Sequence, residues 1–326
     1  MFSNGEILVI AYLLQTIIGV LGNFYLICHY CFHLIQKSPK RIHLILIQLS
    51  FANAMFLLFR GIPMTIFSWG LKFFLNDIVC KIITYLQRVF RGLSICSTSL
   101  LSFFQAIIIS PSSTKWAILK AKLHKSTVPC CILCWILNIL IDAVLPVYIN
   151  GPGNSTKSKW KNKIGYCSMD TYNMDQLKFH YLNAFYDFII VAVMSVSSAY
   201  MVFVLYQHKQ QVQHIHSTKL YPRASPEIRA TKAILLLVSI FFFFNSACII
   251  LAIYIDHFKA SGSWQLYVPM FLSMSFQTIS PLVLIRSETW FFWKCCCFIQ
   301  GIKHSCAIPL SLVSCQTHTD TSKQRF

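Results

Sequence analysis

The stretch that decides the fold most clearly is residues 230–255, which read ATKAILLLVSIFFFFNSACIILAIYI and include a single charged side chain, Lys232. A helix needs about 20 mostly apolar residues to cross the hydrocarbon layer of a bilayer, which is about 30 Å thick. Because backbone groups inside lipid must pair with one another, such stretches are expected to be helices. Further stretches of this kind bring the predicted spans to seven: Ile7–Ile35, Leu44–Trp69, Ile82–Ile109, Val128–Ile149, Tyr181–Gln207, Ala230–Ile255 and Trp264–Ile285.

The composition is typical of a chain embedded in a lipid bilayer. Hydrophobic residues make up 56% of it, charged residues only 12%, and the mean hydropathy is +0.59. A soluble domain has about 25% charged residues, and a transmembrane β-barrel would show short alternating segments. The predicted fold is therefore an all-α membrane protein, a seven-transmembrane helix bundle. No small-residue cleavage site follows the first span, so we expect that span to stay in the protein.

The formal charge of +18 does not indicate nucleic-acid binding, because the basic residues are spread over short loops. With the N-terminus extracellular and the C-terminus cytoplasmic, seventeen Lys and Arg residues fall inside, seven outside and four in or near spans. This bias matches the excess of basic residues in cytoplasmic loops of membrane proteins. The basic loop Asn150–Lys178 is the exception, and taken alone it favours the reverse orientation.

Residues 1–300 are predicted to form one membrane domain that holds all seven spans. Its last part, 287–300, alternates aromatic and charged residues over too short a length to cross, which predicts a short helix lying in the inner interface. Residues 301–326 are expected to be a disordered cytoplasmic tail. Juxtamembrane cysteines are candidates for palmitoylation, with simple burial as the alternative: Cys295, Cys296 and Cys297.

Five ionisable residues lie within or at the edge of the spans: Arg60, Arg88, Arg91, Asp142 and Asp187. Each costs a few kcal/mol or more at the bilayer centre, so each is expected to face the bundle or reach an interface. They form either ion pairs that order the helices or the polar lining of a ligand cavity. Arg88 and Arg91 are three residues apart and share one helix face. The candidates for ligand contact are Arg88, Arg91 and Asp187.

Other polar and kinking residues suggest packing roles. We expect Asn23 and Asn53 to form hydrogen bonds across the pair of helices that the first two spans make. Pro63, Pro146 and Pro281 are expected to kink their helices, because proline removes a backbone donor.

Several motifs together resemble the vomeronasal type-1 pheromone receptors, a family of G-protein-coupled receptors. The longest is LLSFFQAIIISP at Leu100–Pro111, which continues as STKWAILK at Ser113–Lys120. The others are LSFAN at Leu49–Asn53, RGIP at Arg60–Pro63, RVFRGLSIC at Arg88–Cys96, SPEIRATK at Ser225–Lys232 and ISPLVLI at Ile279–Ile285. The resemblance covers about residues 5–300, from the first span to the seventh, which makes the combination specific where a single motif would be weak.

The resemblance implies a multi-pass chemosensory receptor of the plasma membrane that binds a small pheromone-like molecule within the helix bundle. Its implied partner is a heterotrimeric G protein of the inhibitory class, with membrane lipid around the bundle. It also implies a disulfide between Cys80 and Cys167 and a glycan on Asn154, which lies in the only N-x-S/T site of the chain. Asn53 stands where many receptors carry a sodium-binding Asp, and no acid-Arg-aromatic triplet ends the third span. The sequence therefore does not identify the contacts that hold the resting state.

No catalytic set is present, so the chain is not expected to be an enzyme. It has no phosphate-binding glycine loop and no Gly-x-Ser-x-Gly or His-Glu-x-x-His sequence. No metal, cofactor or nucleic acid is expected. Two alternatives remain open from the residues: a transporter or channel subunit, and a receptor of the bitter-taste type. Transporters often show internal repeats and paired broken helices, and neither is evident here.

Overall fold

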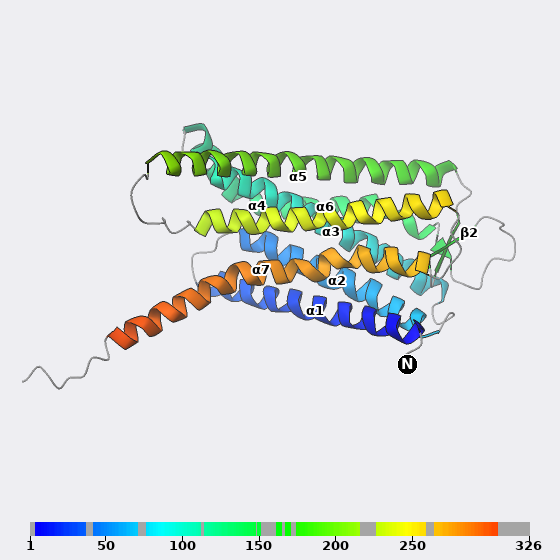
Figure 1. The fold of residues 1–326 in the computed structure, drawn as a ribbon. Coiled ribbons are helices and arrows are strands. Elements are labelled where there is room, and N and C mark those ends of the chain that lie inside the picture. The colour runs from blue at the N-terminus through cyan, green and yellow to red at the C-terminus, as the bar shows by residue number, and fades with distance from the viewer. Residues whose placement is uncertain are drawn as a thin grey trace, which may run out of the picture. The chain divides into compact units, whose positions relative to one another are not determined.

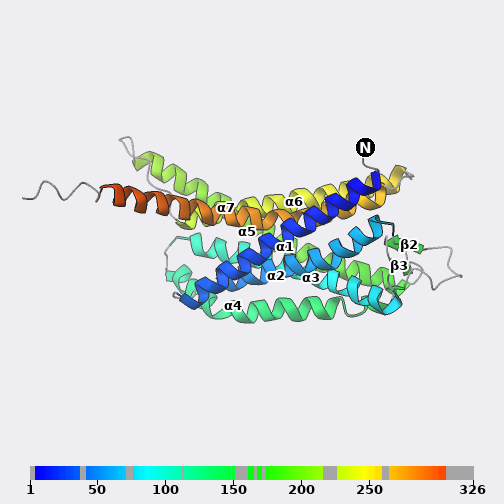
Figure 2. The same cartoon turned by 90° about the horizontal axis from the view of Figure 1, so that it is seen from below.

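The structure, a computed structural model, describes residues 4–36, 42–70, 76–111, 114–147, 149–150, 161–164, 167–170, 174–215, 226–258 and 264–305. Seven long helices dominate this part of the chain and run in alternating directions (Figures 1 and 2). Their bounds are α1 Asn4–Gln36, α2 Ile42–Ser68, α3 Asp77–Ile109, α4 Thr114–Ile141, α5 Met174–Ile215, α6 Pro226–Phe258 and α7 Trp264–Ser305. Within the described residues, seven helices are long and apolar enough to cross a membrane, which confirms the predicted fold class.

Large apolar side chains cover the outside of the bundle. Phe24, Phe188, Val196 and Ile250 are all at least 60% exposed. Contiguous apolar surface of this extent is not found on monomeric proteins in water, and it fits a hydrocarbon solvent. The helices differ in how much of their surface is buried inside the bundle. About 72% of the apolar segment of α3 is buried, against 17% for α4 and for α5.

Helix α3 is therefore the centre of the bundle, and it packs against α2, α4, α5 and α6. Two glycines allow the close approach of neighbouring helices. A Cβ atom at Gly92 would overlap the side-chain oxygen of Asn138 on α4, and one at Gly61 on α2 would overlap the hydroxyl of Thr16 on α1. Small residues at such crossings let helix backbones come together in membranes.

Three of the spans carry prolines inside their helices: Pro63 in α2, Pro129 in α4, and Pro269 and Pro281 in α7. The prediction for Pro146 was wrong. This residue follows the end of α4 and lies in the short 3₁₀ helix η1, Leu145–Val147, where no preceding helical turn is disrupted.

The chain divides into two compact units, Met1–Ile285 and Arg286–Phe326. Helix α7 is continuous from Trp264 to Ser305, so it includes residues 287–300 and no new helix begins there. The predicted extent of the receptor domain, to residue 300, and the interfacial position of its last helix stay predictions. Most of the predicted tail lies outside the described residues.

A small antiparallel sheet lies at the end of the bundle where α1 starts (Figure 1). Its strands are β1 Ile149–Asn150, β2 Lys161–Ile164 and β3 Cys167–Asp170, with β3 in the middle. The sequence analysis did not predict these strands, which are only two to four residues long and show no clear alternation.

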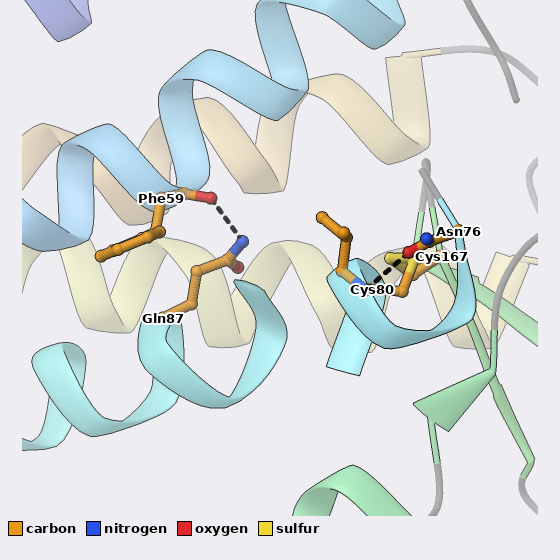
Figure 3. Close-up of a disulfide and its surroundings, with 6 residues drawn as sticks. Phe59, Asn76, Cys80, Gln87 and Cys167 are labelled. Atoms are coloured by element: carbon orange, nitrogen blue, oxygen red, sulfur yellow. Dashed lines mark hydrogen bonds between the residues drawn. A yellow bond between two sulfur atoms is a disulfide. The ribbon is translucent and has the colours of Figure 1, made fainter. Parts of the chain in front are cut away.

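The disulfide between Cys80 and Cys167 joins β3 to the first turn of α3 (Figure 3), as the resemblance implied. Both residues are buried, at 0% and 2% exposure. The turn that presents Cys80 is fixed by Asn76, whose side-chain oxygen accepts a hydrogen bond from the amide of Val79 at 2.9 Å and caps the helix. We call this the disulfide end of the bundle, and the opposite end the far end.

We predict that Cys80→Ser lowers the stability of the bundle and its delivery to the cell surface. The bond closes a loop with a sequence separation of 87 residues, and a disulfide of this kind contributes about 2–4 kcal/mol. Cys28→Ser is the matched control, because Cys28 is a free and exposed cysteine in a span. Surface labelling of intact cells and the thermal unfolding midpoint are the measurements. Equal delivery and equal midpoints in the two variants would contradict the prediction.

Candidate ligand-binding site

A cavity with a volume of about 200 Å³ lies among the described residues, in the half of the bundle nearer the disulfide. Its walls come from α2, α3, α6 and α7. The residues that line it are Phe56, Arg60, Arg91, Ile95, Phe241, Phe244, Asn245, Cys248, Pro269, Leu272, Ser273, Phe276 and Gln277. Four phenylalanine rings and a few polar groups make a wall typical of small-molecule sites.

The charge of this cavity is one-sided. Two arginines contribute to the wall, and none of the thirteen described lining residues is acidic. A buried cation is costly unless an acceptor or counter-charge faces it. The cavity therefore favours an occupant that brings hydrogen-bond acceptors or negative charge.

Arg60 reaches the cavity from α2 and is only partly satisfied by the protein. Its Nη1 donates to Oε1 of Gln87 at 3.4 Å, and its guanidinium carbon lies 5.9 Å from the centre of the Phe56 ring, within range of a cation–π interaction. Its buried Nε has no hydrogen-bond partner among the described residues. Gln87 is itself held by a bond from its amide nitrogen to the carbonyl of Phe59 at 2.7 Å, which Figure 3 shows.

A second, much smaller cavity of about 10 Å³ lies between α3, α4 and α5 and has room for about one water molecule. It brings together the three residues predicted to contact ligand, Arg88, Arg91 and Asp187. Arg91 lines both this cavity and the larger one, whereas Arg88 and Asp187 line only the smaller. Ligand contact by these three residues remains a prediction.

Arg88 has a structural partner. Its Nε lies 3.4 Å from Oδ1 of Asp142, whose side chain is only 6% exposed. The pair joins α3 to the end of α4, which matches the predicted alternative that some of these charges form ion pairs. Breaking a buried pair by removing one member is costly, because the other charge is left uncompensated.

Comparisons with known proteins agree with this architecture. Residues 7–296 match the model of the vomeronasal organ pheromone receptor family, the type-1 vomeronasal receptors. The chain belongs to this family. It is 41% identical to human vomeronasal type-1 receptor 1 over 285 residues, which cover 86% of this chain and 80% of that receptor. Identity to vomeronasal type-1 receptor 3 of the chimpanzee is 39% over 274 residues, which cover 83% of this chain and 88% of that one.

The structure is also similar to the crystal structure of squid rhodopsin, with a TM-score of 0.66 at 17% identity, covering 87% of this chain and 78% of that one. At this identity the likeness concerns the fold, which is that of a seven-helix G-protein-coupled receptor. This vomeronasal-type chain is thus a chemosensory receptor of this class, spans the membrane several times and is not an enzyme. Neither the transporter nor the bitter-taste alternative is supported.

A polar hub lies between this cavity and the far end of the receptor bundle. The amide nitrogen of Asn53 on α2 donates to Ser280 Oγ on α7 at 2.9 Å, and its oxygen accepts from Ser94 Oγ on α3 at 2.6 Å. Asn23 on α1 donates to the carbonyl of Gln277 at 3.0 Å. The two asparagines therefore bind other helices and not each other, so the predicted bridge between the first two spans was wrong.

Two side-chain contacts join α3 to its neighbours at the far end. Gln105 Nε2 donates to Thr231 Oγ1 on α6 at 2.8 Å, with both residues at most 2% exposed. The hydroxyl of Ser110, at the end of α3, lies 2.9 Å from the hydroxyl of Tyr200 on α5. These neutral contacts occupy the place where the sequence lacks an acid-Arg-aromatic triplet.

Some predicted sites are not decided by the structure. Asn154 lies outside the described residues. Cys295, Cys296 and Cys297 fall in the last part of α7, and their lipidation stays a prediction. The described residues contain no group of three or more His, Cys, Asp or Glu side chains able to hold a metal ion.

The sequence analysis missed most of the cavity wall. It noted Arg60 and Arg91 as possible lining residues, but not the rings of Phe241, Phe244 and Phe276 or the amides of Asn245 and Gln277. In a run such as Phe241–Phe244, every position is equally apolar. Only the rotation of α6 decides which of these rings face the cavity and which face lipid.

Proposed function

We propose that this vomeronasal-type receptor responds to small molecules made of an apolar body and one anionic group. The ligand binds in the 200 Å³ cavity, and the receptor then activates a G protein of the inhibitory class. The observation that carries the proposal is the cavity wall itself, with four phenylalanine rings and two guanidinium groups and no acidic residue among the described lining. The inhibitory class is proposed from the family resemblance of the sequence.

The proposed orientation places the N-terminus and the disulfide end outside the cell and the far end in the cytoplasm. Two features support it. Disulfides persist in oxidising surroundings, and seventeen basic residues fall on the cytoplasmic side against seven outside. The cavity then lies in the extracellular half of the bundle.

A tag experiment tests the orientation and the proposed glycan together. In intact cells, an antibody should reach an epitope tag at the N-terminus and not one at the C-terminus. A glycosidase should increase the gel mobility of the wild-type chain and leave Asn154→Gln unchanged, because Asn154 is the only sequon. Labelling of the C-terminal tag alone would reverse the orientation. An outside N-terminus without a mobility shift would overturn only the glycan.

The ligand chemistry follows from what the cavity wall leaves unsatisfied. An anionic group near Arg60 and Arg91 would supply the acceptors that these guanidiniums lack among the lining residues, as charge-assisted hydrogen bonds. The rings of Phe56, Phe244 and Phe276 would cover the apolar body and remove it from water.

We therefore expect the purified receptor in lipid nanodiscs to bind 2-naphthyl sulfate more tightly than 2-naphthol. Arg60→Gln and Arg91→Gln should each weaken binding of the sulfate about tenfold or more, since a hydrogen bond to a charged group contributes about 1.5–3 kcal/mol. Neither change should affect 2-naphthol. Isothermal titration calorimetry is the measurement, and Arg286→Gln, an exposed arginine outside the cavity wall, is the control. Equal affinities for sulfate and alcohol in all four proteins would refute the anionic class.

Coupling to the G protein requires the far ends of α3, α5 and α6 to separate. A ligand does this by binding the open arrangement better than the resting one. The Gln105–Thr231 bond would break in this step, so it is the contact we expect to favour the resting state.

Thr231→Val should raise ligand-independent activity about fivefold, because a buried hydrogen bond contributes about 1 kcal/mol. Thr98→Val is the control of the same size and burial, since the Thr98 hydroxyl donates to the carbonyl of Ser94 on its own helix. Nucleotide exchange on purified inhibitory-class and stimulatory-class G proteins gives the readout. A rise with the stimulatory class alone would overturn the proposed partner, and no difference between the two variants would overturn the role of Thr231.

A further inference from the structure

Arg91 occupies a position that no other charged residue of the described chain shares. Arg91 and Ile95 are the two residues that line both cavities, and only Arg91 is polar. Its guanidinium has no direct hydrogen bond or ion pair with a described residue. On one side it faces the ring-lined cavity, and on the other the water-sized cavity between α3, α4 and α5.

The partner available to Arg91 in the smaller cavity is Asp187 on α5. Four charged residues line that cavity, and two of them, Arg88 and Asp142, already pair with each other at 3.4 Å. Arg91 and Asp187 remain. They interact electrostatically but are too far apart for a direct ion pair, with a space for about one water molecule beside them. A water molecule in such a place can bridge the two groups almost as well as a direct bond.

Polar contacts join this part of α5 to α3. Only 17% of the apolar segment of α5 is buried, so most of that segment faces lipid. Next to Asp187, the hydroxyl of Tyr186 lies 2.9 Å from Cys96 Sγ, and one turn further Ser99 Oγ donates to the carbonyl of Ile190 at 3.1 Å. These contacts do not involve the larger cavity. A change in that cavity can therefore reach this side of α5 through Arg91.

We propose that Asp187 and the ligand compete for Arg91. In the unliganded receptor the guanidinium is held toward Asp187 across the small cavity, which ties α5 to α3. An anionic ligand in the larger cavity draws it away, so that binding releases this part of α5. Asp187 is then a positioning residue that does not touch the ligand. The inference rests on the proposed function, because it needs an anionic group in the larger cavity.

The competition is tested by whether one substitution raises or lowers the affinity of the receptor for the anionic ligand. Asp187→Asn should tighten binding of 2-naphthyl sulfate about fivefold or more, a factor in the usual range for coupled sites. It should leave 2-naphthol unchanged, and Asp187→Glu should behave as the wild type. Unchanged or weaker binding of the sulfate in Asp187→Asn, or equal tightening of 2-naphthol, would overturn the proposal.

Hydrogen–deuterium exchange of residues 183–195 tests the link without any ligand. Asp187→Asn and Arg91→Gln should each raise exchange there several-fold, and the double variant should exchange no faster than either single one. Additive effects would show that the two residues act separately and would overturn the link. If sulfate and alcohol bind alike, the proposed ligand class fails, and this measurement still decides whether Arg91 holds α5.

Discussion

The hydrocarbon layer offers no hydrogen-bond partner, and this constraint shapes every other feature of the molecule. The polar side chains of α3, the most buried helix, find hydrogen-bond partners in two ways. Some turn back onto their own helix, as Thr98 and Ser102 do when they donate to the carbonyls of Ser94 and Thr98. Others bind a neighbouring helix, as Ser94 and Gln105 do. The second group fixes which helices lie around α3.

The spans, their order and the membrane class could be predicted from the sequence because they depend on local properties. The length and hydropathy of each stretch are enough to identify a crossing. The partners of Asn23 and Asn53 could not be predicted in this way, since they depend on how each helix is rotated. The same holds for the rings that line the cavity. Pro146 shows a related limit, because the end of α4 comes a few residues earlier than hydropathy alone suggests.

Charges placed inside the bundle divide into those that the fold neutralises and those that it does not. Arg88 is compensated by Asp142 and links two helices. Arg60 has a weak bond to Gln87 and a contact with an aromatic ring, and Arg91 has no direct partner among the described residues. Keeping two such groups lowers the stability of the unliganded state. Proteins commonly accept this kind of cost at the sites where they bind.

The hydrogen bonds of Asn53 lie apart from the cavity wall, and this has a consequence for how such receptors diverge. Asn53, Ser94 and Ser280 bind one another in the helix interior, and none of them lines the cavity. Phe244 and Leu272 do line it, are only half-buried and carry no hydrogen-bonding atoms in their side chains. Replacements at such wall positions leave the bonds among the helices intact. Single substitutions in the wall can therefore change which molecules fit the cavity while the scaffold stays assembled.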